Sequence, residues 1–233
     1  MIPRIIHQTW KTAALPEAMA ASRRSWIENH PGWEYRLWTD EDIDRLAREN
    51  FPELLELFRS YKYQIQRVDA VRYMFLNLYG GVYVDLDVFC QKPLDDLLDH
   101  GVVLPLTHPI GFSNDFMMAE KGHGFTRFLL DKLPDASRQW DKWYVPRHFR
   151  VLLTTGSLFI SLMYNLYPLS ETVTPLPWRL YNGQSPASYV SHGQGDTWAG
   201  WDFHLFNMLI KHKTAAAFGL VALCAALIWA LFR

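Results

Sequence analysis

The sequence predicts an α/β domain with a mainly parallel central sheet flanked by helices, followed by a C-terminal transmembrane helix. The chain has 233 residues, of which 49% are hydrophobic and 20% charged, and this suits one compact domain. Strand-like and helix-like stretches alternate from the start of the chain. The run from Ala215 to Phe232 carries no charge and approaches the roughly 20 residues that cross a bilayer. We expect the domain over residues 1–210 and the membrane anchor over 214–232.

Composition excludes some classes of function. Lys and Arg number 23 against 24 Asp and Glu, so no overall basic field attracts nucleic acid. Cys90 and Cys224 are the two cysteines, which excludes a disulfide framework or a cysteine zinc site and leaves the redox compartment open. The 15% aromatic content fits either a deep core or a site that stacks on sugars or bases.

The first elements follow from local signals. Ile2 to Gln8 is typical of a short buried strand, and Ser25 to Trp38 indicates a helix end, a Pro-Gly turn and a second strand. A helix is then expected from Glu41 to Asn50. Thr39 or Asp40 is its N-cap, and acidic residues fill its first turn.

Helical spacing of apolar residues predicts the next helix within Tyr61 to Tyr79, and Gly80-Gly81 ends it. Val82 to Phe89 then alternates strictly and predicts a strand. The remaining expected elements are a strand over Val102 to Leu106, a helix over Phe125 to Leu133 and a longer apolar helix over Val151 to Leu166. The last is too polar and interrupted to be our first choice for a second membrane span.

Two carboxylates lie close together in the predicted strand after the glycines. Successive side chains of a strand point to opposite faces, so Asp85 and Asp87 share one face. Two such carboxylates repel each other unless a cation or strong donors lie between them, and hard oxygen ligands suit magnesium or manganese. The alternative is that one aspartate caps the following turn while the other faces solvent.

An acid and a base lie on the helix before this strand. Asp69 and Arg72 are three residues apart and therefore share a helix face. Such a pair is commonly only a surface ion pair. Here the short Gly80-Gly81 connection would bring the Asp69-Arg72 pair near the strand carboxylates. Groups that bind sugar hydroxyls would then lie beside a metal that binds a diphosphate. A sugar-nucleotide site requires that combination.

Several segments together resemble the DXD-containing sugar transferases of glycosyltransferase family 32. They are Ile2-Pro3-Arg4-Ile5-Ile6-His7-Gln8-Thr9-Trp10, Asn29-His30-Pro31-Gly32-Trp33, Arg67-Val68-Asp69-Ala70-Val71-Arg72-Tyr73 and Gly80-Gly81-Val82-Tyr83-Val84-Asp85-Leu86-Asp87. The joint pattern is more specific than any single motif. Within the family the chain most resembles fungal mannosyl-inositol phosphorylceramide synthases and, less closely, initiating α-1,6-mannosyltransferases.

The resemblance implies a GT-A fold, a divalent metal (Mn²⁺ or Mg²⁺), a nucleotide-sugar donor and retention of anomeric configuration. We expect GDP-mannose as the donor, while the residues themselves leave its base and sugar open. The catalytic residues that it implies are Asp69, Arg72, Asp85, Asp87 and Asp115. The donor-binding residues are His7, Gln8, Thr9, Trp10, Asp69, Arg72 and Asn114. The implied metal ligands are Asp85, Asp87 and His192.

Some of these assignments have plain structural alternatives. His192 lies in a glycine-rich loop and is equally explained as a solvated turn residue. Asp115 would also serve as a cap for the following segment. Trp10 would also serve as core packing, and Tyr83 either lines the site or fills space beside it.

The expected activity is transfer of mannose from GDP-mannose to inositol phosphorylceramide. A first alternative keeps the family and changes the acceptor to a glycan, as in an α-1,6-mannosyltransferase or another hexosyltransferase. A second alternative is a membrane-tethered sugar-binding protein without turnover. The expected partners are thus a nucleotide sugar, a lipid or glycan acceptor and a membrane, and the need for a regulatory subunit stays open.

Two arguments about membrane topology disagree. The resemblance implies a single-pass Golgi membrane protein with its catalytic domain in the lumen. Lys211 and Lys213 precede the apolar run and only Arg233 follows it, so the positive-inside rule favours a cytosolic domain. The first residues, MIPRII, have no charged n-region followed by a long apolar stretch, as a signal peptide would. An additional N-terminal segment would resolve the disagreement.

Overall fold

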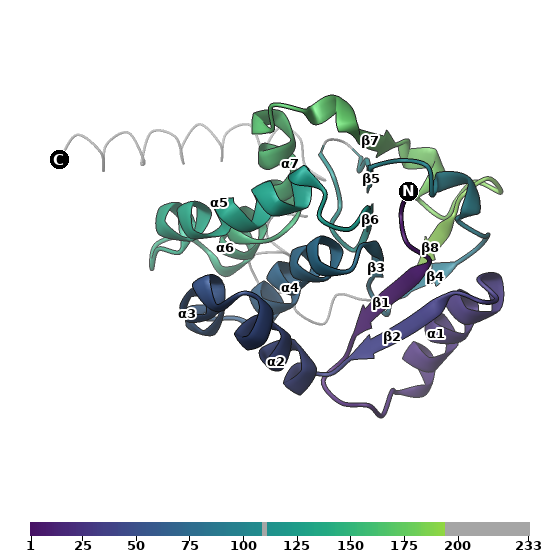
Figure 1. Cartoon of the computed structure of the whole chain (residues 1–233), viewed down its shortest axis with the longest axis horizontal. Helices are drawn as coiled ribbons and strands as arrows, with labels where there is room; N and C mark the ends of the chain where they lie inside the picture. Colours follow the sequence, from purple (N-terminus) through teal and green to yellow (C-terminus); the bar gives the residue numbers. More distant parts are fainter. Residues whose placement is uncertain (109–110, 194–233) are drawn as a thin grey trace, which may run out of the picture.

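A six-stranded sheet forms the centre of the domain (Figure 1). The computed structural model describes residues 1–108 and 111–193, and the expected membrane anchor lies outside these residues. The strands are β1 (Ile5–Thr9), β2 (Glu34–Trp38), β3 (Gly81–Val84), β4 (Val88–Cys90), β5 (Val102–Pro105), β6 (Phe116–Ala119), β7 (Val173–Leu176) and β8 (Val190–His192). The α-helices are α1 (Glu17–Asn29), α2 (Asp40–Asn50), α3 (Leu55–Ser60), α4 (Gln64–Leu78), α5 (Gly124–Trp140), α6 (Arg147–Thr154) and α7 (Ser157–Leu166).

The central sheet is mixed, with the order β2-β1-β3-β6-β5-β7. β1 is parallel to both β2 and β3, and β5 is parallel to β7. β6 is antiparallel to both of its neighbours, β3 and β5. The expectation of a mainly parallel sheet is therefore wrong in this half of the sheet. Only residues 106–115 connect β5 to β6, and a parallel crossover needs a dozen or more residues, so β6 returns antiparallel.

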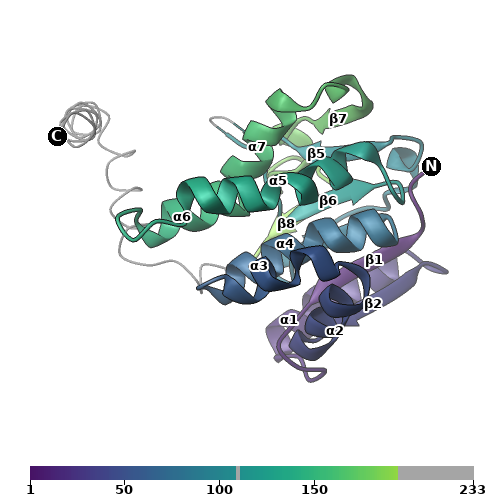
Figure 2. The same ribbon diagram turned by 60° about the vertical axis from the view of Figure 1, so that its left-hand side comes forward.

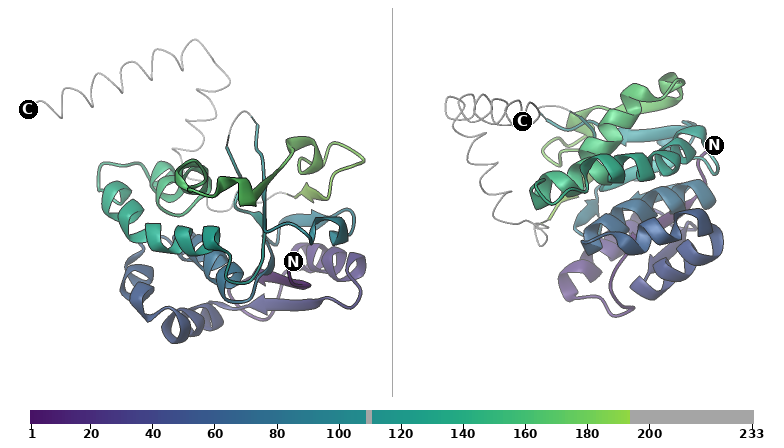
Figure 3. Two further views of the ribbon diagram at one scale, coloured as in Figure 1. Left: turned by 45° about the horizontal axis from the view of Figure 1, so that its top comes forward. Right: turned by 90° about the vertical axis from the view of Figure 1, so that its left-hand side faces the viewer.

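Helices cover one face of the sheet more heavily than the other. Residues of α2, α3, α4, α5 and α7 form one apolar core with the sheet residues Tyr83, Val102 and Met117. On the opposite face, Trp26 of α1 packs with residues of β3, β4 and β6. Figure 2 shows the α4 and α5 layer beside the strands, and Figure 3 shows the same layers from two further directions. The sheet is thus buried on both faces, as the alternation of elements predicted.

The expected helix over residues 41–50 is α2, and it begins with a capping box. The Thr39 hydroxyl accepts a hydrogen bond from the Asp42 backbone N–H, and the Asp42 carboxylate accepts one from the Thr39 backbone N–H. This arrangement satisfies two of the backbone donors that a helix start leaves free.

Two glycines form the turn between α4 and β3. Gly80 and Gly81 have φ angles of +70° and +98°. A Cβ atom on Gly81 would lie 2.5 Å from the Ile5 carbonyl oxygen, and one on Gly80 would lie 2.6 Å from the Lys121 backbone nitrogen. Only glycine accepts both the left-handed conformation and this close approach. The turn joins the helix of Asp69 and Arg72 directly to the strand of the carboxylates.

Two predicted elements are split. The expected strand from Val82 to Phe89 is β3 and β4, which belong to different sheets because β4 pairs with β8. The expected helix from Val151 to Leu166 is α6 and α7, separated at Thr155-Gly156. Strands β6, β7 and β8 were not predicted from the sequence.

One stretch of the described residues, Arg147–Leu166, is long and apolar enough by composition to cross a bilayer. It is interrupted between α6 and α7. Val151, Phe159 and Ile160 from this stretch are buried in the protein. Leu162 and Leu166 of the same stretch are exposed.

Candidate active site

A cleft of about 1160 Å³ opens where β1 and β3 end, between them and helices α4 and α6. Parallel strands commonly bind ligands beyond their carboxyl ends, and this cleft has that position. The residues singled out from the sequence that line it are Thr9, Trp10, Asp69, Arg72, Asp85, Asp87, Asn114, Asp115 and His192. The fold therefore gathers segments from the whole described chain at one place.

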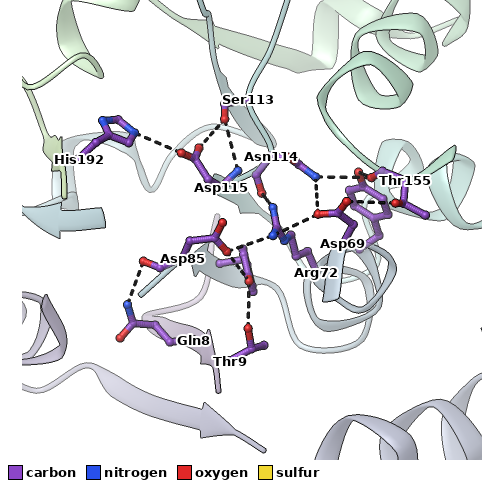
Figure 4. Close-up of polar contacts among 12 residues, drawn as sticks. Gln8, Thr9, Asp69, Arg72, Asp85, Ser113, Asn114, Asp115, Thr155 and His192 are labelled. Atoms are coloured by element: carbon purple, nitrogen blue, oxygen red, sulfur yellow. Dashed lines mark hydrogen bonds and ion pairs between the residues drawn. The ribbon is translucent and has the colours of Figure 1, made fainter. Parts of the chain in front are cut away.

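Arg72 is the centre of the polar network on the cleft floor (Figure 4). It projects from α4, and its side chain is only 3% exposed. Its Nη2 lies 3.1 Å from Asp69 Oδ1 and 3.2 Å from Asp85 Oδ1. Its Nη1 donates to the Asn114 backbone carbonyl at 2.7 Å. One planar guanidinium thus connects α4, the end of β3 and the segment before β6. The compact ammonium group of a lysine could not reach all three in this way.

Asp69 is held by donors on both of its oxygens. Asn114 Nδ2 donates to Oδ1 at 3.1 Å, and Thr155 Oγ1 donates to Oδ2 at 3.0 Å. Burial raises the pKa of Asp69, while Arg72 and these two hydrogen bonds oppose that rise. The Thr155 backbone carbonyl accepts a hydrogen bond from Tyr73 at 2.5 Å, which fixes the break between α6 and α7 beside the site.

Asp85 follows directly after β3, where the chain leaves the sheet. Its Oδ1 accepts a hydrogen bond from the Tyr83 hydroxyl at 2.6 Å, and Thr9 Oγ1 lies 3.2 Å from the same hydroxyl. Burial, together with the charges of Asp115 and Asp87, raises the pKa of Asp85 to about 7 despite Arg72. Tyr83 is fully buried, so its hydroxyl holds the Asp85 carboxylate in a fixed position.

Asp87 follows in the turn before β4 and also lines the cleft. Burial and the charge of Asp115 raise the pKa of Asp87. Across residues 1–108 and 111–193, no cationic side chain lies within ion-pair distance of its carboxylate. This side of the site therefore carries negative charge that Arg72 does not neutralise.

Asp115 lies opposite, before β6, and has three side-chain donors. Ser113 Oγ donates to its Oδ1 at 2.6 Å, and the Tyr181 hydroxyl donates to the same oxygen. His192 Nε2 lies 3.2 Å from Oδ2. Burial would raise the pKa of Asp115, but the hydrogen bonds from His192, Ser113 and Tyr181 hold it below its usual value. Burial lowers the pKa of His192, yet Asp115 and the neighbouring carboxylates raise it overall.

The first-strand segment divides into two parts. Thr9 and Trp10 line the cleft, whereas His7 and Gln8 are fully buried beneath it and do not. His7 Nε2 lies 2.9 Å from the Gly80 carbonyl oxygen, and its Nδ1 accepts from Trp38. Gln8 Nε2 donates weakly, at 3.4 Å, to the Asp85 backbone carbonyl. These two residues therefore position the glycine turn and the Asp85 segment.

A divalent cation fits the side of the cleft occupied by Asp85 and Asp87. In the described part of the chain, no preformed group of three or more His, Cys, Asp and Glu side chains has the arrangement of a metal site. His192 faces Asp115 instead of completing a three-residue set. Asp85 and Asp87 nevertheless both line the cleft, and both have raised pKa values. A bound hard cation would compensate the negative charge of such carboxylates.

Sequence reasoning missed several cleft residues. Lys11, Met19 and Asp40 line the end of the cleft near β1 and β2. Ile65, Val68, Val151 and Leu152 form an apolar wall from α4 and α6. Val68 belongs to the apolar spacing that predicts the helix, and helical periodicity does not distinguish a core face from a cleft wall. Asp40 was recognised only as a helix cap.

A comparison with solved structures identifies the fold. The chain shares the fold of a structure titled PaToxG glycosyltransferase, with a TM-score of 0.54 over 73% of each chain and 17% identity. The mixed sheet with flanking helices is thus a GT-A-like glycosyltransferase fold.

Sequence relatives give the family. Residues 16–104 match the family described as glycosyltransferase sugar-binding region containing DXD motif. The chain is 39% identical to inositol phosphoceramide mannosyltransferase 1 of Schizosaccharomyces pombe, over 96% of this chain and 72% of that protein. It is 36% identical to a mannosyl phosphorylinositol ceramide synthase of Saccharomyces cerevisiae, over 91% of this chain and 57% of that protein. The chain therefore belongs to the DXD-motif glycosyltransferases and is an enzyme of that family.

Proposed function

We propose that this chain transfers mannose from GDP-mannose to inositol phosphorylceramide with retention of anomeric configuration. The observation that carries the proposal is the buried Asp69-Arg72-Asp85 network on the floor of a cleft. Relatives named as inositol phosphoceramide mannosyltransferases support the choice of sugar and acceptor.

In this reaction the bond between the anomeric carbon and the diphosphate breaks, and a bond to an acceptor hydroxyl forms as its proton leaves. Arg72 supplies a fixed positive charge beside the place where the leaving diphosphate gains negative charge. Asp69 on α4 and Asn114 before β6 orient the donor sugar, and Thr155 keeps Asp69 in place. Retention requires either a covalent intermediate on a nearby carboxylate or attack from the leaving-group face, and both routes use this arrangement.

Asp85 and Asp87 would hold Mn²⁺ or Mg²⁺ together with the diphosphate of the donor. The cation, when bound, neutralises charge on the leaving group. Asp115 and His192 would stand next to it, with His192 acting through its contact with Asp115.

Asp40 supports a guanine base in the donor. It is the first residue of α2 and lines the end of the cleft with Trp10 and Met19. Its backbone N–H donates to the Lys11 carbonyl oxygen, which holds the start of α2 beside the cleft. A carboxylate accepts two hydrogen bonds from the N1–H and amino groups of guanine, whereas uracil offers it one N3–H between two carbonyl oxygens.

The acceptor would enter along the apolar wall of α4 and α6. Ile65, Val68, Val151 and Leu152 offer aliphatic surface that suits a lipid acceptor better than a glycan. Attachment through residues 214–232 to a Golgi membrane would keep the domain close to such a lipid.

The test is release of nucleoside diphosphate from a panel of nucleotide sugars, with manganese and with chelator, followed by transfer to inositol phosphorylceramide or to a mannan-type glycan. Wild-type protein is compared with Asp87→Ala and with Asp99→Ala, an exposed aspartate outside the cleft. We expect metal-dependent turnover of GDP-mannose that Asp87→Ala loses and Asp99→Ala keeps. Transfer to the glycan alone would refute the lipid assignment, and donor binding without turnover would refute the proposed activity.

A further inference from the structure

The connection between α5 and α6 exposes aromatic side chains to solvent. Trp143 is 92% exposed, which makes it the most exposed large apolar side chain among the described residues, and Tyr144 is 60% exposed. Their rings contact each other at 5.8 Å between centroids, edge to face. Burying two such side chains in the protein would be favourable, so their exposure indicates a surface that meets another phase or molecule.

The charge around these aromatics is positive. Residues 135–150 contain Arg138, Lys142, Arg147 and Arg150 against two acids, Asp135 and Asp141, in a chain whose net charge is -1. Asp135 is paired with Arg138, and Asp141 is paired with the buried Arg150 at 3.3 Å. Lys142 and Arg147 therefore have no ion-pair partner among the described residues. The excess of basic residues beside exposed Trp and Tyr matches the interface of an anionic bilayer, where aromatic rings sit at headgroup level and basic residues meet lipid phosphates.

The same connection is next to the apolar wall of the cleft. The Arg147 guanidinium stacks on the Tyr63 ring at 4.9 Å, and Tyr63 precedes α4, whose residue Ile65 lines the cleft. From Arg147 to the cleft residue Leu152 the distance along α6 is only about 7.5 Å at the usual rise of a helix. Figure 2 shows the α5–α6 connection at the left end of the helical layer, beside the start of α4.

We propose that the α5–α6 connection, residues 141–147, is a membrane-docking loop that seats the acceptor end of the cleft on an anionic lipid surface. Trp143 and Tyr144 enter the headgroup region, and Lys142 and Arg147 bind lipid phosphates. The aliphatic wall then continues from the bilayer to the site, so that a lipid acceptor reaches the cleft without crossing water. This inference rests on the proposed lipid acceptor, and its test is independent of turnover.

The test places an environment-sensitive fluorophore on the loop of the full chain. Trp143→Cys is labelled in a Cys224→Ser background, while Cys90 is buried and stays in place. The matched control is Glu28→Cys on α1, which lies on the opposite side of the molecule from α6 (Figure 1). Both proteins are reconstituted into phosphatidylcholine vesicles with and without phosphatidylserine, and nitroxide-labelled lipids serve as quenchers.

We expect blue-shifted, lipid-quenched emission at position 143 and water-like emission at position 28. Replacing Lys142 or Arg147 by Gln should lower the ratio of inserted to free loop about fivefold each on anionic vesicles, and little on neutral ones. Emission at position 143 that lipid nitroxides do not quench overturns the proposal. If that unquenched emission is also blue-shifted, the loop is covered by protein and not by lipid.

A second measurement links the loop to acceptor use. Trp143→Ser/Tyr144→Ser should reduce transfer to lipid acceptor in vesicles about tenfold at low acceptor density. Transfer to the same lipid in detergent, and hydrolysis of the donor, should stay unchanged because neither residue lines the cleft. Equal loss in vesicles and detergent contradicts docking. If no lipid is mannosylated at all, the proposed function fails, while the fluorescence still decides whether the loop meets the bilayer.

Discussion

Replacing Arg72 by Lys tests whether the guanidinium fork, and not only its charge, organises the site. The fork reaches Asp69, Asp85 and the Asn114 carbonyl from a position that is 3% exposed. A lysine ammonium at this position keeps the charge but cannot span all three acceptors. Hydrogen bonds to charged groups contribute about 1.5–3 kcal/mol each, and a buried carbonyl without a donor costs about 1–3 kcal/mol.

We therefore expect Arg72→Lys to lower the free energy of unfolding by about 2–4 kcal/mol, which corresponds to roughly 5–15 °C in Tm. The transfer rate should fall by about 10²–10³, the usual effect of losing one well-placed donor. Calorimetry and a donor-turnover assay measure both. Arg67→Lys is the control, since Arg67 lies on the same helix and its Nη2 donates to the exposed Arg59 carbonyl. If both variants behaved alike, positive charge alone would suffice and our reasoning about the fork would be refuted.

Three other substitutions test the supporting structure. Thr155→Val removes a buried donor to a carboxylate and should cost about 1.5–3 kcal/mol in denaturant unfolding, whereas Thr155→Ser should recover most of it. Burial lowers the pKa of His7 to about 4, so only the unfolded chain takes up its proton between pH 6.5 and 4. Stability from His7 is thus lost as pH falls through this range, by up to about 3 kcal/mol, and His7→Gln should remove that part of the pH dependence of unfolding. Gly81→Ala should prevent stable folding because its Cβ would lie 2.5 Å from a β1 carbonyl oxygen, whereas Gly122→Ala, with φ +70° but open space, should lower Tm by only a few degrees. A Gly81→Ala protein as stable as Gly122→Ala would contradict the close approach.

The parts of the fold that local chemistry determines were predictable from the sequence. The cap at Thr39 and the turn at Gly80-Gly81 occur as expected, because a helix start needs side-chain acceptors and a tight turn needs positive φ. The turn also brought Asp69 and Arg72 to Asp85, as its short length predicted.

The parts that depend on distant pairing were not predictable. The run after Gly81 alternates like one strand, yet it bends after Val84. The Asp85 N–H bonds to the Asp115 carbonyl, and the Val88 N–H then bonds back to the Asp85 carbonyl. β4 pairs with β8, about 100 residues later in the chain, and periodicity within one segment carries no information about such a partner. His7 shows the same limit, since its motif did not reveal that its ring packs against Phe75 beneath the cleft.

The distribution of charge explains why the site is organised around two different positive groups. Arg72 compensates Asp69 and Asp85 on the side of α4, and the protonated form of His192 compensates Asp115 on the side of β8. Asp87 lies between these groups with no ion-pair partner among the described residues. Burial raises the pKa of Asp85, and the charges of Asp115 and Asp87 raise it further. A cation bound there would oppose both effects, so cation binding and deprotonation of Asp85 favour each other. The bend after β3 is what makes this possible, because it turns the second carboxylate out of the sheet and into the cleft.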